Sequence, residues 1–169
     1  MPATYEPIAT TTLGTAASSI TFSSIPTTYT DLRLIFVGYA GSGSFANFRI
    51  TFNSDSGTNY SRTTLGGNGG SPSSFNNQNQ SYIDLGIANL SNAQPSMHTM
   101  DLFSYAGSTN KTILLNSSME FNGGSYTGAE ELLVGLWRNT SAINTIRIAT
   151  SSNTYIAGTT ATLYGIKNA

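Results

Sequence analysis

The sequence contains no cysteine and few charged residues. Its 169 residues include 7 Lys and Arg against 8 Asp and Glu, so 9% are charged and the formal net charge is −1. The absence of cysteine excludes disulfides, thiolate catalysis and metal sites with sulfur ligands. Because no basic cluster is present, binding to nucleic acid phosphates or to an anionic membrane surface is not expected.

Long apolar runs are also missing. The best candidate, Leu32–Val37, is six residues long and contains Arg33, whereas a membrane helix needs about 18 apolar residues. The first residues, Met1–Glu6, have neither the positive segment nor the apolar segment of a secretory signal peptide. With 38% hydrophobic and 11% aromatic residues, the chain is nevertheless too apolar for a disordered protein.

The residues that are abundant favour short strands. Ser, Thr, Asn and Gly dominate the polar part of the chain, and they favour turns and solvated strand faces while forming helices poorly. Segments with period-two alternation recur between clusters of Gly, Ser and Asn. The predicted strands are Pro7–Leu13, Ser18–Phe22, Asp31–Val37, Ala46–Phe52, Asn59–Leu65, Tyr82–Ile87, Met97–Tyr105, Lys111–Phe121, Glu131–Arg138, Ile143–Ala149 and Thr160–Ile166.

About ten such strands without a break in composition predict one all-β domain over residues 1–169. Their spacing is typical of an antiparallel β-sandwich, and a jelly roll is the arrangement that it suggests. Alternation also predicts the core-facing side chains of two strands. They are Leu32, Leu34 and Phe36 in one strand, and Phe48, Ile50 and Phe52 in another.

The connections between the strands are rich in Gly and Asn. Gly66–Gln80 combines a glycine-rich stretch with a run of Asn and Gln, and it is predicted to be a long loop. Asn122-Gly123 is predicted to be a β-turn, and Gly107–Asn110 a tight connection. The final strand, Leu163–Ile166, is expected to pair near the N-terminus and to close a sheet.

Side chains suited to catalysis are scarce, so no enzymatic activity is predicted. His98 is the only histidine, it lies in a strand-like segment, and no Gly-x-Ser-x-Gly elbow accompanies it. We interpret it as structural. Glu130 and Glu131 are adjacent, so on a strand they point to opposite faces. Three further carboxylates lie in separate predicted strands: Asp84, Asp101 and Glu120.

One segment has weak metal-binding character. Asn53–Asn59 places oxygen-bearing side chains at alternate positions, as a calcium loop does, but it contains one carboxylate and lacks the acid that closes such a loop. A turn stabilised by Asn and Asp side chains is the favoured interpretation. No metal and no cofactor are therefore predicted.

Aromatic residues near predicted loops are the candidates for a ligand site or an interface. Sugar sites stack rings on aromatic side chains, and interfaces use them as anchors. The candidates are Trp137, Tyr39, Tyr60 and Tyr126. For Trp137, packing in the core or at a subunit interface is the favoured alternative.

Three stretches of the chain carry a resemblance to known proteins. They are Tyr5–Leu32, with Tyr5-Glu6-Pro7-Ile8-Ala9, Ser19–Pro26 and Tyr29–Leu32; Phe52–Ser61; and Ala157–Ile166. Together they resemble a group of small structural or tail-fibre-like proteins of tailed bacteriophages, common in marine phages and cyanophages. The resemblance implies a location in the virion, a β-sandwich and self-association, often as a trimer. It brings no catalytic residues.

Two functions are therefore expected ahead of others. The first is a capsid decoration (cement) protein, which would bind other virion proteins, form a homo-oligomer, be made in the host cytoplasm and be released by lysis. The alternative is a tail-fibre or receptor-binding protein, whose Gly66–Gln80 loop and tyrosines would contact host surface carbohydrate. A free carbohydrate-binding module or enzyme would need an aromatic platform or a converging carboxylate pair, and the sequence shows neither.

Overall fold

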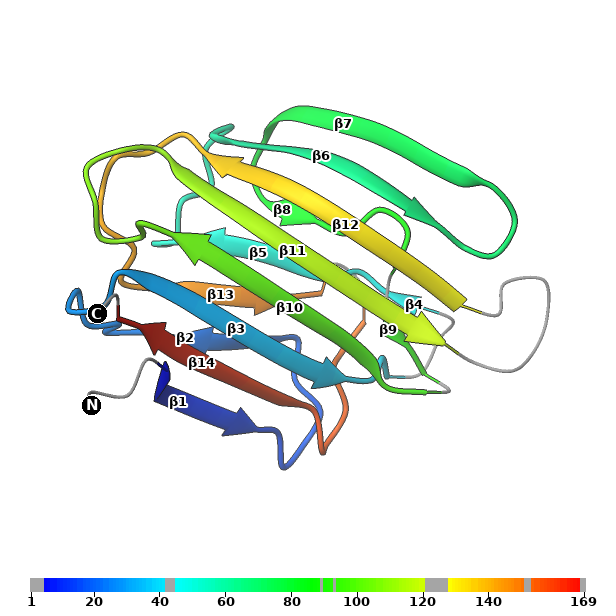
Figure 1. Ribbon diagram of the computed structural model, residues 1–169. Helices are drawn as coiled ribbons and strands as arrows, with labels where there is room; N and C mark the ends of the chain where they lie inside the picture. The colour runs from blue at the N-terminus through cyan, green and yellow to red at the C-terminus, as the bar shows by residue number, and fades with distance from the viewer. Residues whose placement is uncertain are drawn as a thin grey trace.

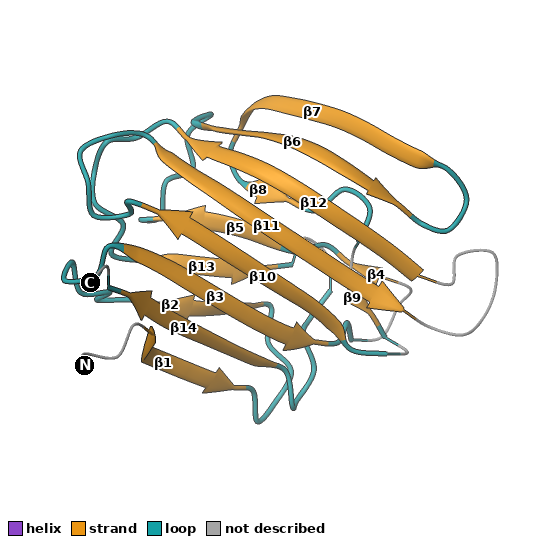
Figure 2. Ribbon diagram, viewed as in Figure 1, coloured by secondary structure: helices purple, strands orange, loops and turns teal. Residues whose placement is uncertain are grey.

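Two antiparallel sheets stack face to face in the computed structural model (Figures 1 and 2). The residues that the structure describes are 5–41, 45–88, 90–92, 94–120, 128–150 and 153–167. These residues form strands and turns without a helix, so no described segment is a helix able to cross a membrane. The predicted all-β sandwich is confirmed.

The strands divide into sheets of eight and four, with one further pair. In spatial order, the larger sheet contains β1 (Tyr5–Thr12), β14 (Thr160–Ile166), β3 (Asp31–Gly38), β10 (Ser96–Phe103), β11 (Lys111–Glu120), β12 (Gly128–Trp137), β6 (Tyr60–Gly67) and β7 (Pro72–Gln80). The smaller sheet contains β2 (Ser19–Phe22), β13 (Ile146–Ala149), β5 (Arg49–Phe52) and β8 (Ile83–Asp84). The separate pair is β4 (Phe45–Ala46) with β9 (Leu90–Ser91).

Eight of these strands follow the order of a jelly roll. They are, along the chain, β1, β2, β3, β5, β8, β10, β13 and β14. The larger sheet holds β1, β14, β3 and β10 side by side, which are the first, eighth, third and sixth of these strands. The smaller sheet holds β2, β13, β5 and β8, which are the second, seventh, fourth and fifth. The remaining strands of the larger sheet, β11, β12, β6 and β7, continue it beyond β10. We call these four strands the extension.

The alternation in the sequence correctly predicts the facing of the core strands. Leu32, Leu34 and Phe36 of β3 are buried, and so are Ile50 and Phe52 of β5. Phe48, which immediately precedes β5, is buried as well. These side chains fill the space between the sheets, where removal of apolar surface from water drives folding.

The prediction of a long loop over Gly66–Gln80 is wrong. Strand β6 continues to Gly67, and β7 pairs with it from Pro72 onward, so only 68–71 form the connection. The sequence hid this strand because Phe75 is its single large apolar side chain. The Phe75 ring lies 5.1 Å from the guanidinium of Arg62 on β6 and helps to hold β7 to the sheet.

The remaining predicted strands and turns agree with the structure to different degrees. The last strand is Thr160–Ile166, as predicted, and it pairs with β1 through partners such as Tyr5 and Ile166. The predicted strand Tyr82–Ile87 shrinks to β8. Gly107–Asn110 lies in the connection between β10 and β11, as expected. The predicted turn at Asn122-Gly123 lies outside the described residues.

Candidate interaction surface

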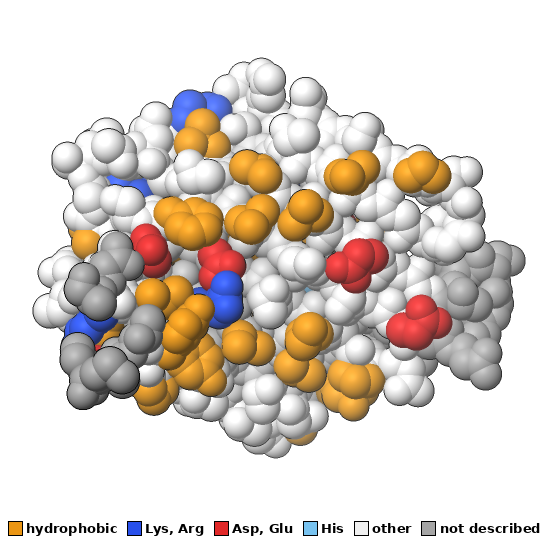
Figure 3. All heavy atoms as spheres, viewed as in Figure 1, with side chains coloured by type: hydrophobic (Ala, Val, Ile, Leu, Met, Phe, Trp, Pro, Cys, Tyr) orange, Lys and Arg blue, Asp and Glu red, His pale blue; other side chains and the backbone are white. Residues whose placement is uncertain are grey.

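The outward side of the larger sheet exposes many apolar side chains (Figure 3). We call this side the outer face. Every large hydrophobic residue that is exposed in the described part of the chain belongs to a strand of this sheet. These residues are Tyr5, Val37, Leu65, Met97, Phe103, Leu132 and Val134. Exposed apolar surface that spans several strands is typical of an interaction site rather than of a free surface.

The strand register places these side chains next to one another. Leu65 of β6 lies opposite Leu132 of β12, and Val37 of β3 lies opposite Met97 of β10. Because residues opposite each other point to the same side of a sheet, each pair forms a joint apolar patch. The pale areas between the patches in Figure 3 are backbone and side chains that are neither hydrophobic nor charged.

The charges near the centre of the outer face neutralise each other. Arg33 of β3 donates two hydrogen bonds to Asp101 of β10, from Nε at 2.6 Å and from Nη2 at 2.7 Å. The side chains are 37% and 20% exposed. A bidentate pair of this kind is already satisfied, so a partner could cover it without supplying a countercharge.

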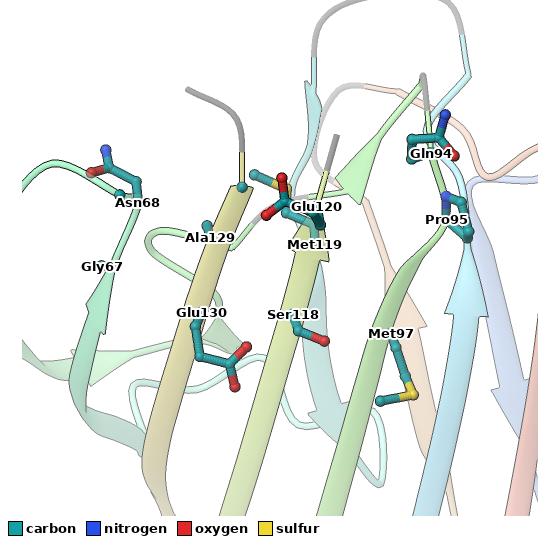
Figure 4. A pocket seen from close by; sticks show the side chains of 12 residues that line it. Gly67, Asn68, Gln94, Pro95, Met97, Ser118, Met119, Glu120, Ala129 and Glu130 are labelled. Carbon is teal, nitrogen blue, oxygen red and sulfur yellow. The ribbon is translucent and has the colours of Figure 1, made fainter. Parts of the chain in front are cut away.

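One end of the outer face is acidic and hollowed (Figure 4). A cavity of about 580 Å³ lies there, and its lining includes Met97, Ser118, Glu120 and Glu130. Ser118 pairs with Glu130, and Glu120 pairs with Gly128, so both carboxylates point to the outward side. They are exposed, and no ion pair joins either of them to another described residue. They give this end of the face negative charge.

The inward side of the extension carries a carboxylate bound by backbone amides. Glu131 of β12 is fully buried, whereas its neighbour Glu130 is exposed, as the sequence predicted for adjacent strand residues. Glu131 accepts hydrogen bonds from the N–H groups of Gly86 at 2.9 Å, Ile87 at 2.7 Å and Ala88 at 2.9 Å. Three consecutive amides thus replace water around one buried charge.

Arg62 and Ser117 complete this attachment. Arg62 of β6 lies 3.1 Å from Asp84 and 3.8 Å from Glu131, and it also donates to the backbone carbonyl of Asp84. Burial raises the pKa of Asp84, and the positive charge of Arg62 opposes this rise. Ser117 of β11 donates to the carbonyl of Ala88 at 3.2 Å. Three strands of the extension therefore hold the segment 84–88 against its inward side.

Two of the four predicted ligand or interface residues lie in the core. Trp137 and Tyr60 are fully buried, and their rings stack at 6.3 Å. The core interpretation therefore holds for Trp137. Tyr39 is half-buried, and its backbone contacts Ile156, far from the other two. Tyr126 lies outside the described residues. The described part of the chain does not bring these aromatic residues into one site.

The calcium-like segment is a turn built around Asp55. The Asp55 carboxylate accepts hydrogen bonds from the Gly57 N–H at 2.8 Å, from Asn59 at 2.9 Å and from the Trp137 indole at 2.7 Å. Burial disfavours the charged carboxylate, but these donors outweigh it and hold the pKa of Asp55 below its ordinary value. Within the described residues, no three His, Cys, Asp or Glu side chains gather as a metal site would require.

The residues considered for catalysis lie apart. His98 of β10 is buried, stacks on Phe48 at 4.4 Å and shares a hydrogen bond with Ser117. Its burial lowers the pKa to about 3, so the ring is neutral near neutral pH. Asp84 lies beneath the extension, Asp101 pairs with Arg33 on the outer face, and Glu120 lies at the acidic end. These carboxylates do not converge.

Sequence reasoning missed the residues that build this surface. Leu132, Val134 and Leu136 alternate along β12, which is a valid strand signal, but Leu133 between them is buried. Apolar residues on both sides of a strand do not reveal which side is the core. That Leu65 and Leu132 form an exposed apolar pair could be recognised only from the cross-strand register.

Comparison of the chain with models of protein families, with curated proteins and with solved structures found no match. The fold class of the protein therefore rests on the arrangement of its own strands. It is a β-sandwich of two antiparallel sheets, and its larger sheet exposes apolar patches.

Proposed function

We propose that this protein is a non-enzymatic structural protein of a bacteriophage particle, and that it decorates the capsid by seating its outer face on the shell. The observation that carries this proposal is the apolar outer face with its internally neutralised centre. Eight strands about 4.8 Å apart, each contributing about 26 Å of length, give a face of roughly 900 Å². A standard protein interface buries about 800 Å² on each partner.

The distribution of polar groups supports a binding role over a catalytic one. The one histidine is buried, and the three separate carboxylates do not converge. Surfaces outside the outer face are kept polar mainly by hydroxyl and amide groups, with few charges. The resemblance of the sequence to small virion proteins points to the same role, with the protein made in the host cytoplasm and released with the particle on lysis.

The tail-fibre alternative loses part of its support. It relied on tyrosines and on a long loop for contact with host carbohydrate. Tyr60 is buried, and most of Gly66–Gln80 is strand. The alternative therefore becomes one outcome of the test below.

The test combines the position of the protein on the particle with one charged substitution. We expect Leu132→Lys to reduce retention of the protein on sedimented particles by about tenfold or more, because a charge would be buried in an apolar contact. Thr21→Lys, on the outward side of β2 in the smaller sheet, is the matched control and is expected to bind normally.

Averaged maps of the virion give the second readout. Density at repeated capsid sites, with the larger sheet toward the shell, is expected. Density confined to the tail would replace this proposal with the adhesion function. Equal retention of Leu132→Lys and the unmodified protein would show that the outer face is not the surface that binds the capsid.

A further inference from the structure

The two sheets have four edges, and three of them carry features that discourage pairing with another strand. In the smaller sheet, the edge strands β2 and β8 are four and two residues long. In the larger sheet, β1 contains Pro7 and an irregularity in its pairing between Pro7 and Ala9. Short strands, prolines and bulges are the usual means by which proteins keep their edges from associating.

The fourth edge, β7, is long and carries such features only at its two ends. It is nine residues long, it has no charged residue, and its only proline, Pro72, stands at the first position, where it interrupts no pairing. The register with β6 is regular from Pro72 to Asn77, and its one irregularity comes after that. Most side chains of β7 are exposed, and the strand forms the margin of the sheet in Figure 1.

An edge of this kind offers free backbone groups along one side. Each strand pairs through alternate N–H and C=O groups, so the groups of β7 that point away from β6 face solvent. Phe75, packed beneath Arg62, anchors the strand to the sheet and keeps the edge extended. The run Ser73–Asn77 is therefore a preformed template for one more strand.

We infer that β7 pairs with β7 of a second copy of this chain, antiparallel and across a two-fold axis perpendicular to the sheet. Such a contact is self-complementary, because the same edge supplies equal numbers of donors and acceptors on both sides. The absence of charge on β7 means that no like charges meet across the axis. Asn and Gln side chains on neighbouring strands can hydrogen-bond to each other, since each carries a donor and an acceptor.

The geometry of this pairing also fits the rest of the molecule. A two-fold axis perpendicular to the sheet leaves both outer faces pointing in the same direction. The two larger sheets would join into one sheet of sixteen strands, with eight from each copy. The inference depends only on the sheet edge, so it does not require the proposed function to be correct.

The lack of cysteine permits a direct test by cross-linking. Single cysteines at Ser73, Ser74, Asn76, Asn77 and Gln78 introduce one thiol per chain, so any disulfide must join two copies. Opposed residues in an antiparallel pair have Cα atoms about 4.5–5.5 Å apart, which is within the range that a disulfide spans. We expect covalent dimers from the positions nearest the axis under mild oxidation.

Two control positions separate this contact from other modes of association. Thr12→Cys tests the β1 edge, and Leu132→Cys tests contact between outer faces. Both are expected to remain monomeric on denaturing gels. Cross-linking that is absent along β7, or stronger at either control position than along β7, would overturn the inference.

Sedimentation provides a measurement without covalent capture. The unmodified protein is expected to form a reversible dimer, and the double variant Ser74→Lys, Asn76→Lys to raise the dimer dissociation constant by about tenfold or more, because like charges then face each other. Thr12→Lys is the control with the same type of charge on the opposite edge. A monomer at all concentrations, or an unchanged dissociation constant in the double variant, contradicts the pairing. Retention of Leu132→Lys on particles is measured separately, so either proposal can fail without the other.

Discussion

The jelly-roll strands and the extension differ in what they bury. In the smaller sheet, Ile20, Ile50 and Ile148 point inward, while Thr21 and Arg147 point outward. This is the ordinary distribution for a half-buried sheet. The extension departs from it, because the inward side of its strands buries charged residues. The buried charged residues are Arg62, Lys111 and Glu131.

The covering element explains the difference. The jelly-roll strands are covered by a second sheet, whose backbone groups are already paired and whose inner side chains are apolar. Part of the inward side of β6, β11 and β12, around Glu131, instead meets the chain segment 84–88, whose amide and carbonyl groups bind side chains of these strands. Those groups require polar partners, and Glu131, Arg62 and Ser117 supply them. Lys111 likewise donates to backbone carbonyls of connecting segments, at Gly107, Thr109 and Thr140. The polarity of a strand face is therefore set by what lies against it.

Among these predictions, removal of the buried carboxylate of Glu131 should change the free energy of unfolding most. Glu131→Ala leaves three buried amides without their partner and removes one of the two carboxylates beside Arg62, so we expect a loss of about 3–5 kcal/mol in the free energy of unfolding. Glu130→Ala, one residue away on the outer face, is expected to change it by less than about 0.5 kcal/mol. Denaturant titration of both variants checks the contrast, and comparable losses would contradict it.

Hydrogen exchange can locate the effect of that substitution. In Glu131→Ala, amides of β6, β7 and segment 84–88 should lose protection before those of β13. Uniform loss across both sheets would show that the extension does not open separately from the jelly-roll strands.

Acid should lower the free energy of unfolding through His98, which lies on β10 next to the extension. Its pKa is about 3 in the folded protein and about 6.5 when unfolded, so between these values the unfolded chain binds one more proton. Stability from this group is full above about pH 6.5 and declines by about 1.4 kcal/mol per pH unit below it. Stability curves from pH 7 to 5 for the protein and His98→Asn measure this slope. A His98 resonance that titrates near pH 6.5 in the folded state would refute the expectation.

The smallest expected effect on stability concerns the outer face. Leu132→Thr and Val134→Thr replace exposed side chains with polar residues that also favour strands, so the free energy of unfolding should change by less than about 0.5 kcal/mol. Thermal or chemical unfolding of the double variant gives the value. A loss of several kcal/mol would mean that these residues serve the fold rather than an interface.

The sequence predicts the jelly-roll part of this fold better than the extension. Alternation identified β3 and the buried side chains around β5, because their apolar residues lie on one side only. It missed β7, because a run of Asn and Gln has no apolar period and its strand conformation comes from pairing with β6. Tertiary context, rather than local propensity, decides such a segment.

The same reasoning explains what the sequence could not tell about the site. Trp137 was a candidate because tryptophan is frequent at interfaces, yet Asp55 satisfies its indole N–H inside the core. Glu131 carries no local signal of its role, because its partners lie more than forty residues away in the chain. Such long-range partners are visible only once the strand register is known.

The position of the last strand has a consequence for how this chain acquires its structure. β14 lies between β1 and β3, and Tyr5 pairs with Ile166. Without β14, the strand that links β1 to β3 in the sheet is missing. A chain without β14 therefore holds an incomplete sheet, and the closing step must bring together residues as far apart in the sequence as Tyr5 and Ile166. Topologies dominated by such distant pairings fold slowly, so the pairing of β14 with β1 and β3 is expected to form late in folding.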